Sequence, residues 1–242
     1  MPTTSTYKPS STGQTLPEAA LADTRTSYDT VATIYAEQVR NLLDETPEER
    51  AVLALFADLV RTSGGGPVAD VGCGPGRITA HLRELGVDAF GIDLSPAMIE
   101  VAGRDHPGLR FEVGSMTDLD LADASMAGLV AWYSLIHVPD EEIGSVLAHF
   151  HRVLRPGGPL LLSFHVGDES RLKTQGYGGH PMNVYVHLRQ SCQMTAWLND
   201  AGFTVEAHRT LSSAESMLGG ILLARRQPDT RQRTSSGRRS HG

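Results

Sequence analysis

The chain of 242 residues has little of what marks secreted, membrane-spanning or nucleic-acid-binding proteins. It contains two cysteines, Cys73 and Cys192, so a disulfide framework is excluded as the support of the fold. It has no apolar run near membrane-spanning length, and residues 1–15 lack the apolar core of a secretory signal. Its formal charge of -7 disfavours a large polyanionic partner, because nucleic-acid binding depends on neutralising phosphates. We therefore expect a cytoplasmic monomer or homodimer that acts on a small molecule, with no nucleic-acid or membrane partner.

The hydrophobic fraction of 40% is sufficient for one domain with a sizeable core. Residues 1–22 are rich in Ser, Thr and Pro, and residues 227–242 are polar and basic, so we predict two disordered tails. The domain then covers residues 23–226. We divide it into N-terminal helices at 23–62, a ligand-binding half at 67–165, a long loop at 166–188, and the remaining part of a sheet at 190–226.

Short apolar runs alternate with segments of helical spacing beyond residue 67. The first predicted strand begins at Val68. The others cover 87–92, 109–113, 127–132, 160–165, 203–208 and 220–225. The intervening helices include one that starts at Ser95 and Pro96, with Ser95 as the N-cap. Alternating strands and helices of this length indicate an α/β fold with a mostly parallel, doubly wound sheet of seven strands and helices on both faces.

The stretch from Val68 to Thr79 has the most informative spacing. A buried strand enters Asp70, three glycines follow at Gly72, Gly74 and Gly76, and a helix then begins. Glycine permits positive φ and close approach of a ligand to the backbone. The start of the helix presents free N–H groups and the positive end of its dipole at the same place. This arrangement predicts a site for a nucleotide-like ligand.

The glycine spacing departs from the G-x-G-x-x-G fingerprint of dinucleotide-binding proteins. The sequence from Asp70 to Gly76 instead resembles the first motif of the class I S-adenosylmethionine-dependent methyltransferases, an acidic residue followed by G-x-G-x-G. Three further segments carry the resemblance: Asp93 at the end of the second strand, residues 114–119, and the Pro-Gly-Gly turn at 156–158. The resemblance covers residues 25–225. It implies S-adenosyl-L-methionine as cofactor, a cofactor-binding half at 67–165, and a seven-stranded sheet whose last strand is antiparallel.

The resemblance also assigns candidate cofactor-binding residues. Asp70 and the glycine turn would hold the methionine part, Asp93 the ribose, and Ser115 and Met116 the adenine. Trp132 would lie beside the sulfonium, and a helix carrying Tyr28 and Tyr35 would close over the cofactor. The complete predicted set is Tyr28, Tyr35, Asp70, Gly72, Cys73, Gly74, Gly76, Asp93, Leu94, Met98, Ser115, Met116 and Trp132.

Two histidines are candidates for a general base. His137 follows the fourth strand and His165 ends the fifth, where parallel sheets bind ligands. Histidine titrates near neutrality, so either could accept a proton from a methyl acceptor. No spacing of metal ligands is convincing, and we expect no metal site. The stretch 166–188, with its glycines and aromatic residues, is interpreted as an irregular lid that chooses the acceptor.

Three classes of function remain open. The first is a methyltransferase acting on an O, N or C atom of a small metabolite. The second is a nucleic-acid or protein methyltransferase, which the acidic charge and the residues Ala131 to Ser134 disfavour, because an Asn/Asp-Pro-Pro-aromatic sequence is absent there. The third is an NAD-type nucleotide-binding protein without methyl-transfer activity.

Overall fold

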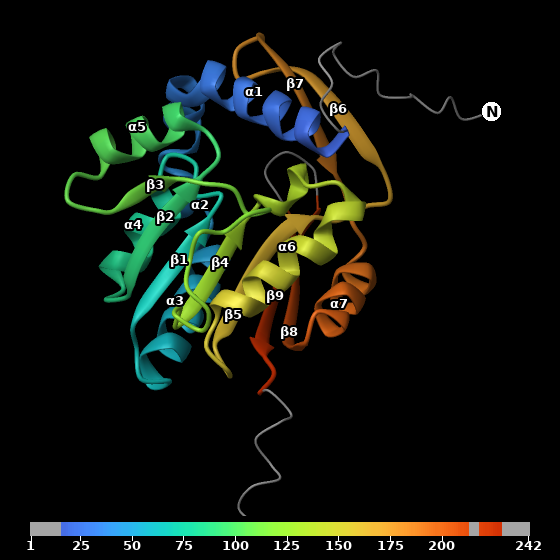
Figure 1. Ribbon diagram of the computed structural model, residues 1–242. Helices are drawn as coiled ribbons and strands as arrows, with labels where there is room; N and C mark the ends of the chain where they lie inside the picture. The colour runs from blue at the N-terminus through green and yellow to red at the C-terminus, as the bar shows by residue number, and fades with distance from the viewer. Residues whose placement is uncertain (1–15, 213–217, 229–242) are drawn as a thin grey trace, which may run out of the picture.

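The computed structural model describes residues 16–212 and 218–228. Its centre is a seven-stranded sheet of order β3-β2-β1-β4-β5-β9-β8 (Figure 1). The strands are β1 (Pro67–Val71), β2 (Asp88–Asp93), β3 (Phe111–Val113), β4 (Gly128–Trp132), β5 (Pro159–His165), β8 (Phe203–Ser212) and β9 (Leu218–Arg226). Strand β9 pairs antiparallel with both β5 and β8, and the pairs among β1 to β5 are parallel. The predicted sheet of mostly parallel strands with an antiparallel last strand is confirmed.

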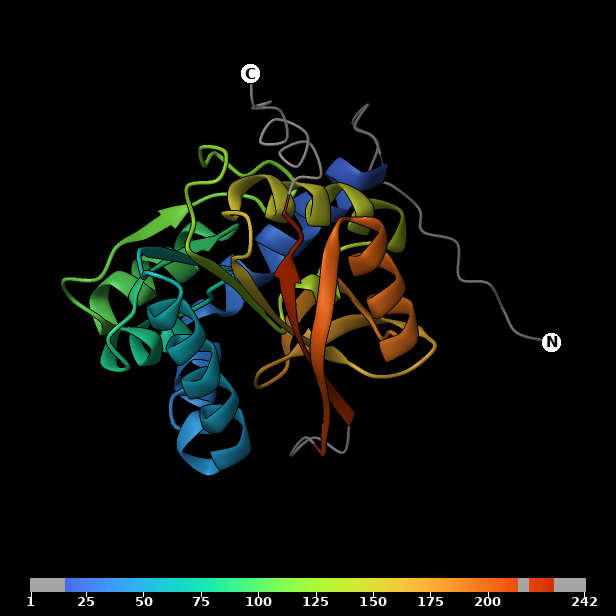
Figure 2. The same cartoon turned by 90° about the horizontal axis from the view of Figure 1, so that it is seen from below.

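Helices cover both faces of this sheet. They are α1 (Leu16–Val39), α2 (Leu42–Glu45), α3 (Pro47–Thr62), α4 (Arg77–Glu84), α5 (Pro96–Asp105), α6 (Asp140–Val153) and α7 (Ser191–Asp200). Alternate residues of β1 point to opposite faces: Val68 packs with α3 and α4, whereas Ala69 packs in the core that includes α6 and α7. Figure 2 shows α3 and α7 on opposite sides of the sheet. The two apolar layers therefore hold the strand ends in fixed positions.

Local sequence signals explain several helix starts. The Ser95 side chain accepts a hydrogen bond from the backbone N–H of Met98 at 3.1 Å, and Pro96 follows at the first helical position of α5. This is the predicted N-cap, which satisfies one of the free N–H groups of the first turn. Helix α3 begins at Pro47 with Glu48 and Glu49 in its first turn, next to the positive end of the helix dipole.

The stretch 166–188 is not the irregular loop that we predicted. Most of it forms an antiparallel hairpin of β6 (Ser170–Gly176) and β7 (His180–His187), separate from the main sheet. Met182 and Val184 are buried against Val31 of α1, while Pro181 and Asn183 are exposed. This two-residue alternation is typical of a strand with one buried face. The high content of glycine and polar residues concealed it in the sequence.

The first helix is longer than predicted. It begins at Leu16, so residues 16–22, which we assigned to a disordered tail, are helical. Residues 1–15 and 229–242, the remainder of the two predicted tails, lie outside the described residues. Among the described residues, no helix combines the length and the apolarity needed to cross a membrane.

The strand order reverses direction between β1 and β4. From β1 the chain moves outward through β2 and β3, and it then returns to place β4 on the other side of β1. In open α/β sheets, ligands bind at the carboxyl ends of the strands at such a switch point. Figure 1 shows α1 and the β6–β7 hairpin above this edge of the sheet.

Candidate functional site

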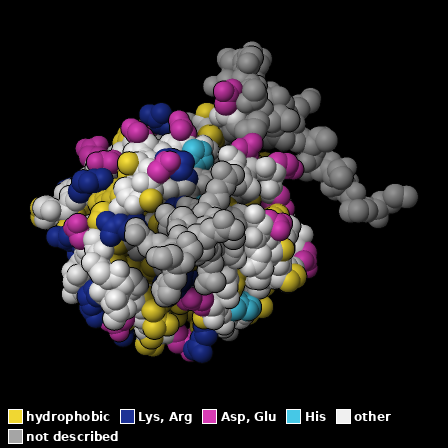
Figure 3. Space-filling view, turned by 60° about the horizontal axis from the view of Figure 1, so that its bottom comes forward, with side chains coloured by type: hydrophobic (Ala, Val, Ile, Leu, Met, Phe, Trp, Pro, Cys, Tyr) yellow, Lys and Arg dark blue, Asp and Glu magenta, His cyan; other side chains and the backbone are white. Residues whose placement is uncertain are grey.

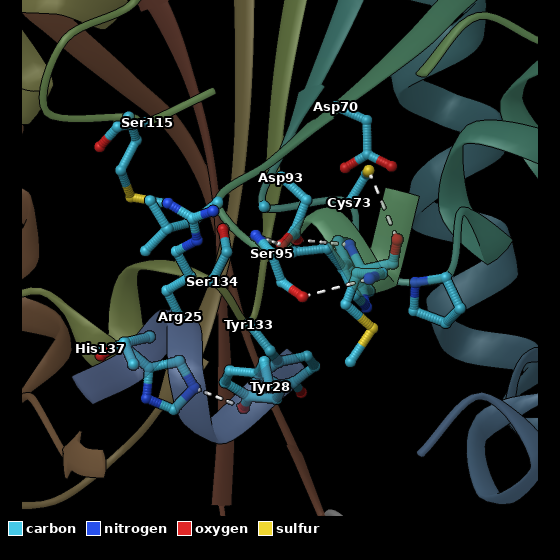
Figure 4. Close-up of a pocket in the computed structure, with 18 of the residues that line it drawn as sticks. Arg25, Tyr28, Asp70, Cys73, Asp93, Ser95, Ser115, Tyr133, Ser134 and His137 are labelled. Atoms are coloured by element: carbon cyan, nitrogen blue, oxygen red, sulfur yellow. Dashed lines mark hydrogen bonds between the residues drawn. The ribbon is translucent and has the colours of Figure 1, made fainter. Parts of the chain in front are cut away.

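A cavity lies at the carboxyl ends of β1, β2 and β4, beneath α1. Thirteen of the residues predicted from the sequence line it: Tyr28, Tyr35, Asp70, Gly72, Cys73, Gly74, Asp93, Leu94, Met98, Ser115, Met116, Trp132 and His137. Figure 4 shows Asp70, Cys73 and Asp93 on one side of the cavity and His137 with Tyr28 on another. The structure thus brings together segments from five parts of the chain.

The glycine turn forms one wall of the cavity. Gly72, Gly74 and Gly76 have φ values of 77°, 53° and 83°, a region in which glycine carries no steric penalty. A Cβ at Gly72 would lie 2.2 Å from the Cβ of Ser134. The turn therefore approaches the end of β4 so closely that a side chain at position 72 would have to displace Ser134.

Asp93 joins the glycine turn to the start of α5. One of its carboxylate oxygens accepts a hydrogen bond from the N–H of Gly74 at 2.8 Å, and the other accepts one from the N–H of Ser95 at 2.9 Å. Burial raises the pKa of Asp93, and the two backbone hydrogen bonds oppose that rise. A carboxylate has about four lone-pair positions, so each oxygen can still accept a hydrogen bond from a ligand.

Asp70 is the fully buried carboxyl group of the cavity. The Thr79 hydroxyl donates to its Oδ2 at 2.7 Å, whereas no described residue donates a hydrogen bond to its Oδ1. Burial raises the pKa of Asp70 to about 7, against the Thr79 hydrogen bond and the positive charge of Arg77, which lower it. A buried polar atom without a partner is costly, and Asp70 therefore offers an acceptor to a cationic or hydrogen-bonding ligand.

Tyr28 and His137 form a hydrogen-bonded pair on another wall. The Nδ1 of His137 lies 2.8 Å from the carbonyl oxygen of Tyr185, and its Nε2 lies 2.7 Å from the hydroxyl oxygen of Tyr28. Because a carbonyl oxygen only accepts, Nδ1 carries the hydrogen and Nε2 accepts from the Tyr28 hydroxyl. Burial lowers the pKa of His137 to about 4, so its ring is neutral at pH 7.

Two of the predicted residues lie outside the cavity lining. Gly76 is the N-cap of α4, and a Cβ there would lie 2.6 Å from Phe111 Cζ. Its lack of a side chain therefore permits packing. His165 packs its ring against Tyr133, with ring centroids 5.0 Å apart.

Several residues that line the cavity were not predicted from the sequence, including Arg25, Arg77, Tyr133 and Ser134. Arg25 precedes Tyr28 by three residues on α1, so helical periodicity could have placed it on the same face. Ser134 donates a hydrogen bond to the carbonyl of Val71 at 2.7 Å, across the two neighbouring strand ends. Nothing in the sequence indicates this contact, because it joins residues far apart along the chain.

Within residues 16–212 and 218–228, no group of three or more His, Cys, Asp or Glu side chains is placed to hold a metal ion. The cavity holds instead carboxyl groups, backbone N–H groups, aromatic rings and hydroxyls. This donor set can bind a polar organic ligand through hydrogen bonds.

Comparison with known proteins gives a consistent result. Residues 68–158 match the family model described as a methyltransferase domain. O-methyltransferase cnsE of Penicillium expansum is 37% identical over 111 residues, which are 43% of this chain and 40% of that protein. The malonyl-[acyl-carrier protein] O-methyltransferase of Pseudescherichia vulneris is 29% identical over 140 residues, which are 58% of this chain and 49% of that protein. This chain therefore spans less than half the length of both relatives.

Solved structures share the fold over most of the chain. The 1,6-didemethyltoxoflavin-N1-methyltransferase of Burkholderia thailandensis, solved with bound 1,6-didemethyltoxoflavin and S-adenosylhomocysteine, aligns with a TM-score of 0.65 at 22% identity. The alignment covers 91% of this chain and 94% of that one. At this identity the likeness establishes the fold.

Proposed function

We propose that this chain, which has the class I methyltransferase fold and a methyltransferase domain at residues 68–158, moves the methyl group of S-adenosylmethionine to an oxygen, nitrogen or carbon atom of a small metabolite. The match of residues 68–158 to a methyltransferase-domain model and the shared fold support the family resemblance identified in the sequence. The observation that carries the proposed activity is the pair of carboxyl groups, the buried Asp70 and the partly buried Asp93, on either side of the glycine turn.

Two features of the cavity fit this cofactor. The first is the Oδ1 atom of Asp70, buried without a donor among the described residues and therefore available to an ammonium group. The second is the bare backbone of the glycine turn, which a ligand can approach closely. Asp93 would accept hydrogen bonds from the ribose hydroxyls, Ser115 and Met116 would contact the adenine, and Trp132 would lie beside the sulfonium.

The bound cofactor supplies an already activated methyl group. The protein then has to align an acceptor with that group, and alignment alone accounts for several kcal/mol of a reaction barrier. Tyr28 is held for this purpose by His137, which accepts its hydroxyl hydrogen. Its ring and hydroxyl oxygen consequently have a fixed position in the cavity wall.

His137 is also our candidate for the group that receives a proton from the acceptor. Its Nδ1 hydrogen bond to the Tyr185 carbonyl leaves Nε2 as the basic atom, and since Nε2 accepts from the Tyr28 hydroxyl, the proton would reach it through that hydroxyl. Because burial lowers the pKa of His137 to about 4, the ring is unprotonated at pH 7, but it is a weak base. It therefore fits best an acceptor that loses its proton late, after the new bond to carbon has begun to form. His165, beyond Tyr133, would reach only an acceptor that extends outside the described cavity.

The β6–β7 hairpin and α1 would form the cover over the acceptor. Asn183 of β7 donates from its backbone N–H to the Ser27 hydroxyl and from its side chain to Asp23, both at 2.8 Å. The Tyr177 ring packs edge-on against Tyr35, with ring centroids 4.9 Å apart. These contacts tie the hairpin to α1, so the two elements would close over the acceptor together and decide which acceptor fits.

A small acceptor is also consistent with the surface. On the face in Figure 3, acidic and basic side chains are interspersed among the described residues, without a continuous basic patch. Nucleic-acid binding requires several phosphate contacts from clustered Lys and Arg. This face is therefore unsuited to a long polyanion.

A screen of small metabolites against the full chain tests the proposal. The chain is incubated with S-adenosylmethionine and metabolite pools, and formation of S-adenosylhomocysteine is followed by mass spectrometry, with an incubation without acceptor as control. We expect at least one neutral or zwitterionic metabolite to give acceptor-dependent formation. Methylation of RNA or protein extracts but of no metabolite would favour the second class of function, and reduction of NAD without methyl transfer would favour the third.

A further inference from the structure

Arg77 has an unusual position in the cavity wall. It is the first residue of α4 and lines the same cavity as Asp70 and Trp132. Its Nη1 atom is buried, and no described residue accepts a hydrogen bond from it. A guanidinium group has five N–H donors and no acceptor, so a buried nitrogen of this kind calls for an anionic or carbonyl oxygen.

The carboxyl groups near Arg77 do not supply that oxygen. Asp70 and Glu49 lie close enough for the positive charge of Arg77 to lower the pKa of each. No ion pair of 4.0 Å or less joins Arg77 to either residue in the described part of the chain. The Asp70 carboxyl is instead bonded to Thr79 at 2.7 Å. The charge of Arg77 is thus available to a ligand.

The unsatisfied atoms of Asp70 and Arg77 are complementary. Asp70 is the second-last residue of β1 and Arg77 is the first of α4, so the two residues flank the glycine turn, and both line one cavity. Among the described residues, the Oδ1 of Asp70 is a hydrogen-bond acceptor without a partner, and the Nη1 of Arg77 is a positively charged donor without a partner. An ammonium and a carboxylate on the same carbon atom would satisfy both, and a free amino-acid group is the ligand that carries this pair.

We propose that Arg77 binds the α-carboxylate of the cofactor's methionyl group while Asp70 binds the α-ammonium. This inference rests on the proposed function, since it takes S-adenosylmethionine as the ligand, and it adds a binding residue outside the family motif. The carboxylate would pair with Arg77 through charge-assisted hydrogen bonds, which are stronger than those between neutral groups. The start of α4, with its free N–H groups, would add to the attraction.

A comparison of two ligands in three proteins tests the assignment. S-adenosylhomocysteine carries both the ammonium and the carboxylate. Its decarboxylated form, S-adenosyl-3-thiopropylamine, keeps the ammonium but has no carboxylate. We expect the wild-type chain to bind the first more tightly by about tenfold or more. In Arg77→Gln the ratio of the two Kd values should fall to nearly one. Arg77→Lys, which keeps the charge, should retain part of the preference. Isothermal titration calorimetry gives each Kd.

Three controls make the result specific. Arg83→Gln removes a charge from the same helix, at an exposed residue paired with Asp88, and should keep the wild-type preference. Binding of 5′-methylthioadenosine, which lacks the whole amino-acid end, should be the same in Arg77→Gln and wild type, and it reports that the adenosine part of the site is folded. Arg25→Gln tests the other arginine of the cavity, which lies 3.8 Å from Asp29.

The possible results distinguish a wrong assignment of Arg77 from a wrong proposed function. A carboxylate preference that survives in Arg77→Gln, or one that disappears in Arg25→Gln instead, would overturn the assignment while leaving the proposed function intact. If the wild-type chain bound none of the three adenosine thioethers, the proposed function itself would be wrong.

Discussion

Replacing Asp93 by alanine should weaken the binding of S-adenosylhomocysteine by about 10- to 100-fold. The carboxylate would lose two hydrogen bonds from the ribose, and hydrogen bonds to charged groups contribute about 1.5–3 kcal/mol each. Asp93 also accepts the N–H groups of Gly74 and Ser95, so its removal loosens the glycine turn as well. Isothermal titration calorimetry on the folded variant measures the loss.

Asp88→Ala is the matched control for this experiment. Asp88 begins the same strand, is exposed, and pairs with Arg83 at 2.6 Å, outside the cavity. It should bind S-adenosylhomocysteine as the wild type does. Unchanged affinity in a folded Asp93→Ala protein would remove Asp93 from the ligand site.

The affinity for S-adenosylhomocysteine should fall by about 100-fold between pH 8 and pH 5. In the free protein, burial raises the pKa of Asp70 to about 7. An ammonium group binds the ionised carboxylate, so below pH 7 the ligand must compete with a proton. Since His137 has a pKa lowered to about 4, it stays neutral over this range and contributes little to the change.

The same pKa predicts how the free protein's stability depends on pH. The pKa of Asp70 in the folded state, about 7, lies above the ordinary value of 3.8. The folded state therefore holds this proton more tightly than the unfolded state does. The resulting stability is fully present below pH 3.8 and is lost as the pH rises through about 7. Bound ligand should reduce this loss, because its ammonium stabilises the ionised form.

Asp70→Asn separates the contribution of Asp70 to the pH dependence of binding from the contributions of Asp93 and Glu49. Burial raises the pKa values of those two residues as well. Asparagine is neutral at every pH, so the variant should bind weakly throughout and show a much flatter pH profile. Calorimetric titrations at several pH values measure both proteins. An affinity that is constant from pH 5 to pH 8 in the wild type would contradict the role given to Asp70.

Local signals in the sequence were enough to predict most of the central fold. The apolar runs that become β4 and β5 are buried on both faces, and such runs are typical of strands inside a parallel sheet. The N-cap at Ser95 and the glycine turn follow from side-chain size and hydrogen bonding within a few residues. The predicted site residues near these turns consequently line the cavity.

Contacts between distant segments could not be predicted in this way. His137 meets Tyr28 across 109 positions of sequence, and its lowered pKa results from this burial. The hairpin at 170–187 has exposed residues on one face and buries Met182 and Val184 only because α1 covers them. Arg77 stands directly after the glycine motif, yet its unsatisfied nitrogen becomes visible only when its surroundings are known.

We propose above all that the cavity beside the glycine turn binds S-adenosylmethionine and its product. Isothermal titration calorimetry of the wild-type chain with S-adenosylhomocysteine and, separately, with NAD measures this binding. We expect a Kd for S-adenosylhomocysteine at least about 100-fold below that for NAD. Equal or tighter binding of NAD, or no binding of S-adenosylhomocysteine, would contradict it.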